Sequence, residues 1–247
     1  MSSVLDSDRG HPRLATQPVV EAVFELRGKN AKPFTLLPGQ FVAALAERYP
    51  LIEETETAKI AGMTELPQEA GLFVTHKLTS ADRRDLVQLG ATGFSVNSTS
   101  YSGFGEFRAE VSRVLRVYLE LAAVRKIERL GLRYINFVEP GASYFSNLSL
   151  TVQWPDLPGG EPEGVAVRAL FRYNDPVGEL AVAVGGPDPR GTLLDLDFFS
   201  KQPETLAADD ILSWFDRAHE RVYEAFRWMV RPEIFTAWER VSSSEVG

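Results

Sequence analysis

The chain contains no cysteine among its 247 residues. Disulfides, thiolate catalysis, iron–sulfur ligation and cysteine-based zinc sites are therefore excluded. Histidine is nearly as scarce, since only His11, His76 and His219 occur and none has a second histidine at ligand spacing. We therefore expect no bound metal and no cofactor.

Long apolar runs are also missing. No stretch approaches the ~18 uninterrupted apolar residues that a membrane helix needs. Residues 1–16 carry acids among their bases and have no apolar core of signal-peptide length. These features predict a cytoplasmic protein without a membrane contact. The net charge of −8 disfavours nucleic acid as a partner, because an acidic body repels phosphate backbones.

The usual catalytic and phosphate-binding motifs are absent too. There is no Gly-x-Ser-x-Gly elbow and no Gly-x-x-x-x-Gly-Lys loop. The stretch Gly103-Phe104-Gly105 precedes a predicted helix, as glycines do in dinucleotide-binding folds. It lacks the third glycine and a parallel β-α-β context, so we interpret it as a tight turn into the helix.

Alternating polar and apolar residues indicate many half-buried strands. In Val20 to Arg27, for example, even-numbered positions are apolar and Glu21, Glu25 and Arg27 lie on the other face. The same reasoning predicts strands over residues 19–27, 51–61, 71–79, 85–90, 93–98, 127–138, 148–154, 164–173, 178–184 and 192–199. Short turns between them favour an antiparallel meander, and hence an α+β fold with mainly antiparallel sheet.

Three segments have helical periodicity instead. Apolar residues recur every three or four positions over about 103–124 and 209–230, which predicts two long amphipathic helices. A short helix should begin at Pro38 and end at Pro50. We expect a leader at 1–16, one domain at 17–235 and a tail at 236–247. Each half, 17–125 and 126–235, repeats the order of a lead strand, a meander and a long helix, which suggests two loosely repeated halves.

The segments PVVEAVFELR, RLGLRYIN and LLDLDFF occur in an order that resembles a sporadically distributed family of bacterial proteins of about 250 residues. The resemblance spans roughly residues 17–235. It implies one domain and a patchy distribution among bacteria, typical of accessory genes that move between genomes. No catalytic residue follows from it.

Two pairs of charged residues stand out on predicted strands. Arg129 and Arg133 share a face with Gly131 between them, and Asp195 and Asp197 share a face of a later strand. The arginines and aspartates could pair across the sheet, which we favour, or the arginines could bind an anion or a partner. Alternatively, the aspartates could begin a two-metal site completed by Glu21 or Glu25.

The remaining binding candidates are polar or aromatic residues beside the predicted core. They are Tyr134 and Asn136 in the RLGLRYIN strand and His219 on the last helix. A third hypothesis for the function is a small-molecule pocket lined by Tyr134, Phe137 and Trp214. His219 flanks the apolar stripe of its helix, which favours a hydrogen bond to the sheet over a role as general base.

These observations lead us to expect a non-enzymatic accessory or interaction protein. Its partner would be a protein, such as the product of a neighbouring gene in a mobile or defence-type locus. The alternatives are a metal-dependent nuclease or nucleotide-processing enzyme using Asp195 and Asp197, and a small-molecule-binding domain.

Overall fold

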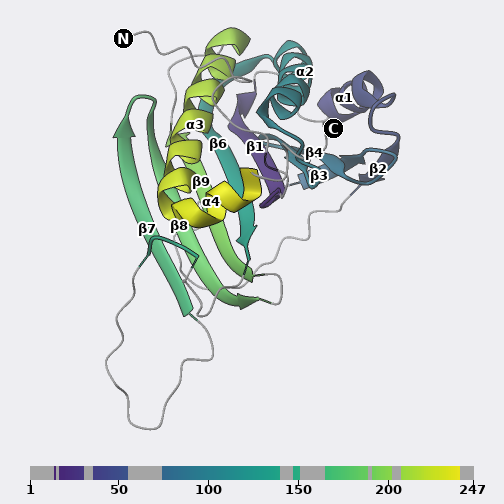
Figure 1. Cartoon of the computed structure of the whole chain (residues 1–247). Helices are drawn as coiled ribbons and strands as arrows, with labels where there is room; N and C mark the ends of the chain where they lie inside the picture. Colours follow the sequence, from purple (N-terminus) through teal and green to yellow (C-terminus); the bar gives the residue numbers. More distant parts are fainter. Residues whose placement is uncertain are drawn as a thin grey trace, which may run out of the picture.

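The computed structural model describes residues 14, 17–30, 36–54, 74–139, 147–150, 165–188, 191–201 and 207–239. Over these ranges nine strands form one antiparallel sheet (Figure 1). In chain order they are β1 Val19–Asn30, β2 Leu51–Glu54, β3 Val74–Thr79, β4 Asp85–Gly90, β5 Gly93–Ser98, β6 Val124–Val138, β7 Val165–Asn174, β8 Val177–Asp188 and β9 Gly191–Lys201. The expected α+β class with antiparallel sheet is confirmed.

The strand order across the sheet is β2-β3-β4-β5-β1-β6-β9-β8-β7. Strands β1 and β6 pair at the centre, with Leu26 opposite Leu130. On one side of this pair β5 lies beside β1, and on the other side β9 lies beside β6. In chain order each meander begins at an edge, at β2 or at β7, and runs inward to β5 or β9.

The helices are α1 Leu37–Leu45, α2 Phe104–Ala122, α3 Ala208–Met229 and α4 Pro232–Glu239. Helices α1, α2 and α3 pack on one face of the sheet, because the stripes predicted for the long helices meet the apolar face of the strands (Figure 1). At the centre Phe24 of β1 contacts Phe215 of α3 at 5.0 Å between ring centroids. Phe94 of β5 contacts Tyr118 of α2 at 4.8 Å. No described helix is long and apolar enough to cross a bilayer.

Helix α4 is an element that the sequence analysis missed. It crosses residue 235, beyond which we had expected a tail, and it buries Phe235 and Trp238. The ring of Trp238 stacks on Phe226 of α3 with 6.2 Å between centroids. A helix of eight residues has little intrinsic stability, so this packing on α3 is what holds it.

Two expected strands are shorter within the described residues. Strand β2 covers 51–54 of the expected 51–61, and residues 55–61 lie outside the described part. In the expected strand 148–154, Leu148 forms an isolated bridge to Val230, and residues 151–154 are not described. Of the expected leader only Leu14 is described, and residues 240–247 of the expected tail lie outside the description.

Candidate functional site

Arginines and aspartates pair on the face of the sheet opposite the helices. Arg133 donates two hydrogen bonds to Asp195, from Nε at 2.8 Å and from Nη2 at 2.7 Å. Arg129 lies between two carboxylates, with Nε 3.1 Å from Glu25 and Nη2 3.0 Å from Asp197. The register places Arg133 opposite Asp197, but its guanidinium reaches the diagonal Asp195 and leaves Asp197 to Arg129.

This pairing is the ion-pair arrangement that we favoured from the sequence. Burial raises the pKa of Asp197, and the charges of Arg129 and Arg133 oppose that rise. Both aspartates thus face guanidinium groups within hydrogen-bonding distance. Among the described residues, no three His, Asp or Glu side chains are grouped so that they could hold a metal ion.

The other candidates, Tyr134, Asn136 and His219, come together on the helix side of the sheet. They line a cavity of about 560 Å³ between β6, the start of α2 and the second half of α3. Its described lining residues are Leu14, Gln17, Pro18, Val19, Tyr101, Ser102, Gly103, Phe104, Gly105, Glu106, Tyr134, Asn136, Leu196, His219, Val222, Tyr223 and Phe226. We treat this cavity as the candidate functional site.

Local structure explains why these side chains meet. The two-residue period of β6 places Tyr134 and Asn136 on the apolar face, next to Leu196 of β9. His219 is 5% exposed and lies on the buried stripe of α3. Its ring stacks on Phe104 at 3.8 Å between centroids with an interplanar angle of 5°. As the sequence suggested, His219 bonds to the sheet, with its Nδ1 3.1 Å from the Tyr134 hydroxyl.

Tyr101 lies next to Tyr134 and so extends the group of polar side chains around His219. Tyr101 lies edge-on to Tyr134 with 5.3 Å between ring centroids. Burial raises the pKa of Tyr101 to about 12, partly opposed by a hydrogen bond with Tyr134. Burial also raises the pKa of Tyr134, and Tyr101 adds to the shift. Both phenols are therefore neutral hydrogen-bonding groups at physiological pH.

Asn136 is a buried polar residue in the lining of the cavity. Its side chain is 1% exposed, and its amide nitrogen donates to the carbonyls of Tyr134 and Leu194 at 3.2 and 3.0 Å. No described residue donates a hydrogen bond to its Oδ1, although the residue lines the cavity. A hydrogen-bond donor on a bound molecule would therefore find an acceptor at this oxygen, which would stabilise the complex.

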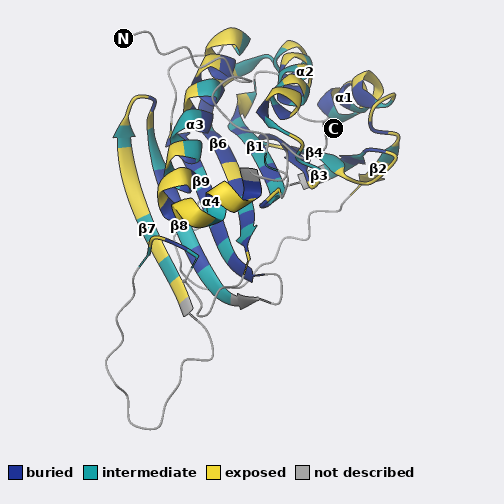
Figure 2. Cartoon of the chain, viewed as in Figure 1, coloured by how far each residue is buried: buried dark blue, intermediate teal, exposed yellow. Residues whose placement is uncertain are grey.

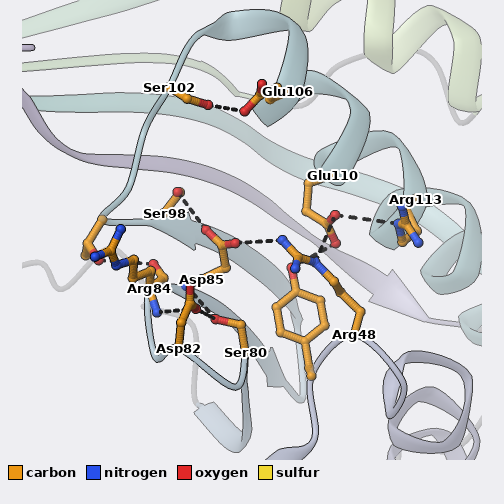
Figure 3. A network of polar contacts seen from close by, with 12 residues as sticks. Arg48, Ser80, Asp82, Arg84, Asp85, Ser98, Ser102, Glu106, Glu110 and Arg113 are labelled. Carbon is orange, nitrogen blue, oxygen red and sulfur yellow. Dashed lines mark hydrogen bonds and ion pairs between the residues drawn. The ribbon is translucent and has the colours of Figure 1, made fainter.

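The N-terminus of α2 forms one wall of the cavity. Gly103 precedes the helix with φ of +155°, a conformation that favours glycine, and no side chain caps the helix end. This agrees with the tight turn that we expected at Gly103-Phe104-Gly105. In the first turn, Glu106 accepts a hydrogen bond from Ser102, as Figure 3 shows. Glu106 is an exposed residue of the cavity lining.

The pocket that we expected from Tyr134, Phe137 and Trp214 is only partly right, because Tyr134 alone lines this cavity. Phe137 lies one position from Asn136 on β6 and so faces the other side of the sheet. Trp214 packs on Phe198 in the core, 5.9 Å between centroids, one and a half turns before His219 on α3.

Sequence reasoning missed Tyr101 and Tyr223 as site residues. Tyr101 precedes the two glycines before α2, and Tyr223 lies four residues after His219. The spacing of Tyr223 from His219 was a usable signal, because residues four apart share a helix face. Nothing in the sequence indicated that Tyr101 would lie beside Tyr134.

A second polar network lies between α1, β4 and α2 and is visible in Figure 3. Arg48 donates to Asp85 at 2.9 Å, and Asp85 also accepts a hydrogen bond from Ser98 at 2.7 Å. Tyr49 donates to Glu110 of α2 at 2.8 Å. These contacts join the residues after α1 to the sheet and to α2, so we assign the network a structural role.

No protein-family model matches the chain, and a comparison with curated proteins also returned no match. The resemblance to a sporadic bacterial family stays a prediction.

Proposed function

We propose that this protein binds a small molecule in the cavity between β6, the N-terminus of α2 and α3. The observation that carries the proposal is the combination of Asn136 Oδ1, an acceptor with no described donor, with a cavity of about 560 Å³. Pockets for small molecules have about this volume and combine apolar walls with a few fixed polar groups.

The alternative explanation is a packing defect in the core. Protein interiors are close-packed, and voids much larger than a water molecule are few because each one costs stability. Here the lining also has a built polar arrangement, with His219 fixed between Tyr134 and the ring of Phe104. Side chains that are already held in place lose less conformational freedom when a ligand binds, so the site is pre-organised.

A thermal-shift screen of a metabolite library tests the proposal. Compounds that bind the native state should raise the melting temperature, and the rise should grow with the logarithm of their concentration above Kd. The same compounds should fail on Val222→Phe, which adds a ring to a buried wall residue of the cavity. Val222→Ile, which adds one methylene, is the matched control and should keep the response.

Ligand-induced shifts are measured against the melting temperature of each variant, because overpacking alone can cost about 1–3 kcal/mol. A compound that stabilises the wild type and Val222→Phe equally binds elsewhere. A library without any stabilising compound, or with only such compounds, would contradict the proposal.

A protein partner, our first expectation from the sequence, is the second candidate function, and the edge strand β7 favours it. Much of β7 is exposed (Figure 2). Large apolar side chains are exposed around it, including Val177 at 71% and Trp228 of α3 at 68%. Phe171, Tyr173, Trp228 and Met229 line a groove of about 360 Å³ between β7 and α3. Isolated exposed apolar residues are common, but a group beside an open sheet edge is typical of interfaces.

The expected occupant is an extended segment of the partner that adds a strand beside β7. Strand β7 carries Arg168 and Arg172 and no acidic residue. Arg172 already pairs with Glu179 of β8 at 3.4 Å, so a carboxylate of that segment would complement Arg168. The product of a neighbouring gene is the partner to test by co-purification and titration. Arg168→Glu with Trp228→Ser should abolish the complex, and unchanged affinity would exclude this edge. Self-association of the chain alone would identify a second copy as the occupant.

We also infer that the two halves arose by duplication, as the order of elements in the sequence suggested. The strand order supports this, because each lead strand pairs with the last strand of its own meander. An asparagine lies near the end of each lead strand, Asn30 in β1 and Asn136 in β6. Asn30 accepts a hydrogen bond from the Tyr118 hydroxyl at 3.0 Å, whereas Asn136 lines the cavity. Of the two corresponding asparagines, the one in the second half, residues 126–235, is the one that lines the candidate site.

A further inference from the structure

The described lining residues of the cavity include one carboxylate and neither lysine nor arginine, and the only histidine among them is His219. The carboxylate is that of Glu106. The chain as a whole has a net charge of −8, which adds a negative background potential. The charges available to a ligand therefore favour a cation.

The N-terminus of α2 opposes this preference, because the end of a helix carries roughly +0.5 of an elementary charge. The carboxylate of Glu106 sits in the first turn of that helix and contributes a full negative charge. The sum of the two is about −0.5, so the local field still favours positive charge. The helix end alone would have suggested an anion, and Glu106 reverses that conclusion.

Aromatic rings supply a second attraction for a cation. Tyr101, Phe104, Tyr134, Tyr223 and Phe226 line the cavity from three different segments. Tyr101 and Tyr223 are half-buried, so part of each ring remains accessible. The face of an aromatic ring attracts a cation within about 6 Å, and the gain is greatest where water is excluded.

The acceptor of Asn136 gives the ligand a further requirement. Its Oδ1 needs a hydrogen-bond donor, which a protonated amine supplies and a carboxylate or phosphate does not. An anion placed beside this oxygen and beside Glu106 would be repelled by both. The Asn136 acceptor and the negative charge of Glu106 therefore both favour a cationic ligand over an anionic one.

We infer that the ligand is a protonated amine carried on an aromatic ring system. This inference rests on the proposed small-molecule function and specifies the ligand class for the same cavity. The amine would face Asn136 Oδ1 and Glu106, and the ring system would lie among the aromatic side chains.

Three indole compounds that share a ring but differ in charge test the inference by calorimetry. Tryptamine is a cation, tryptophol is neutral and indole-3-propionate is an anion at pH 8, where imidazole is uncharged. Tryptamine should bind about tenfold more tightly than tryptophol, as a partly desolvated cation–π contact and a charged hydrogen bond predict. Indole-3-propionate should bind most weakly of the three.

Glu106→Gln should weaken tryptamine binding about threefold to fivefold, the range for an exposed carboxylate, and leave tryptophol unchanged. Glu120→Gln is the matched control, because it removes the same charge from an exposed position near the other end of α2. It should change the affinity for tryptamine less than twofold.

The outcomes separate this inference from the proposed function. Equal affinities for tryptamine and tryptophol that Val222→Phe abolishes would keep the small-molecule site and refute the charge preference. Tightest binding of indole-3-propionate would show that the helix end dominates, which also refutes the inference. Failure of tryptamine to bind contradicts the inference, whereas a library with no stabilising compound contradicts the proposed function itself.

Discussion

Replacing Arg129 by Met removes the cation that lies between two carboxylates while keeping an apolar side chain of similar length. The guanidinium of Arg129 also lies over the ring of Phe199, 4.5 Å from its centroid, a position that the methionine can still fill. The substitution therefore tests the charge of Arg129 separately from its packing on Phe199. Glu25 keeps a contact with Arg27 at 2.9 Å, but Asp197 loses its hydrogen-bonding partner.

The magnitude follows from the burial of the three groups. Breaking a fully buried ion pair costs about 3–5 kcal/mol, because an uncompensated charge remains. The side chains of Arg129, Glu25 and Asp197 are 15%, 17% and 26% exposed, so water partly compensates. We expect a loss of about 2–3 kcal/mol at pH 8. For a domain of this size that lowers Tm by about 5–10 °C.

The loss should depend on pH with a defined sign. Burial already raises the pKa of Asp197, and removing Arg129 removes the strongest influence that lowers it. Between the ordinary and the raised pKa the folded state binds more protons than the unfolded state, so stability falls as pH rises through that window. The deficit of Arg129→Met should therefore be smaller at pH 5 than at pH 8.

Urea denaturation at both pH values measures these effects. Arg116→Met is the control, because Arg116 and its partner Asp209 are 58% and 86% exposed and the loss of this pair should cost about 1 kcal/mol or less. Adding Asp197→Asn to Arg129→Met should restore part of the stability at pH 8. Equal losses for the two arginine variants, or a further loss in the double variant, would refute the reasoning.

Three further predictions concern the core and the cavity. Trp214→Ala should cost about 3–5 kcal/mol in urea denaturation. Trp214→Phe should cost less than about 1.5 kcal/mol, because Nε1 has no described hydrogen-bond partner to lose, and a larger cost would indicate one. Trp238→Ala should cost about 3–5 kcal/mol, since the ring packs on Phe226, and a loss below 1 kcal/mol would mean that α4 is not held there. Since the pKa of Tyr101 is raised to about 12, stability should fall between pH 10 and 12, where the unfolded phenol ionises first. Tyr101→Phe should reduce that fall in Tm, and an identical pH profile would contradict the shift.

The strands and the two long helices followed from the sequence because their signals are local. A strand with one buried face must alternate, and a helix on a sheet must carry an apolar stripe, whichever partner covers it. Strands β4 and β5 appear at the residues predicted for them. Helix α4 escaped prediction because eight residues give too short a periodic signal, and its stability comes from packing on α3.

The sequence predicted that the arginines and aspartates pair, but not which arginine binds which aspartate. The two-residue period placed Arg129, Arg133, Asp195 and Asp197 on shared faces, which made pairing across the sheet the favoured interpretation. The register between β6 and β9 placed Arg133 opposite Asp197, and the directions of the side chains then paired Arg133 with Asp195 and Arg129 with Asp197. Register depends on contacts between distant segments, so a local pattern does not contain it.

The cavity belongs almost wholly to the tertiary structure. Its walls come from segments near residues 101–106, 134–136 and 219–226, which are far apart along the chain. The sequence identified Tyr134, Asn136 and His219 as polar groups beside a core, but not that they share one space with Tyr101. A cavity is the volume that packed elements leave unfilled, and only the packing of α2 and α3 on β6 determines where that volume lies.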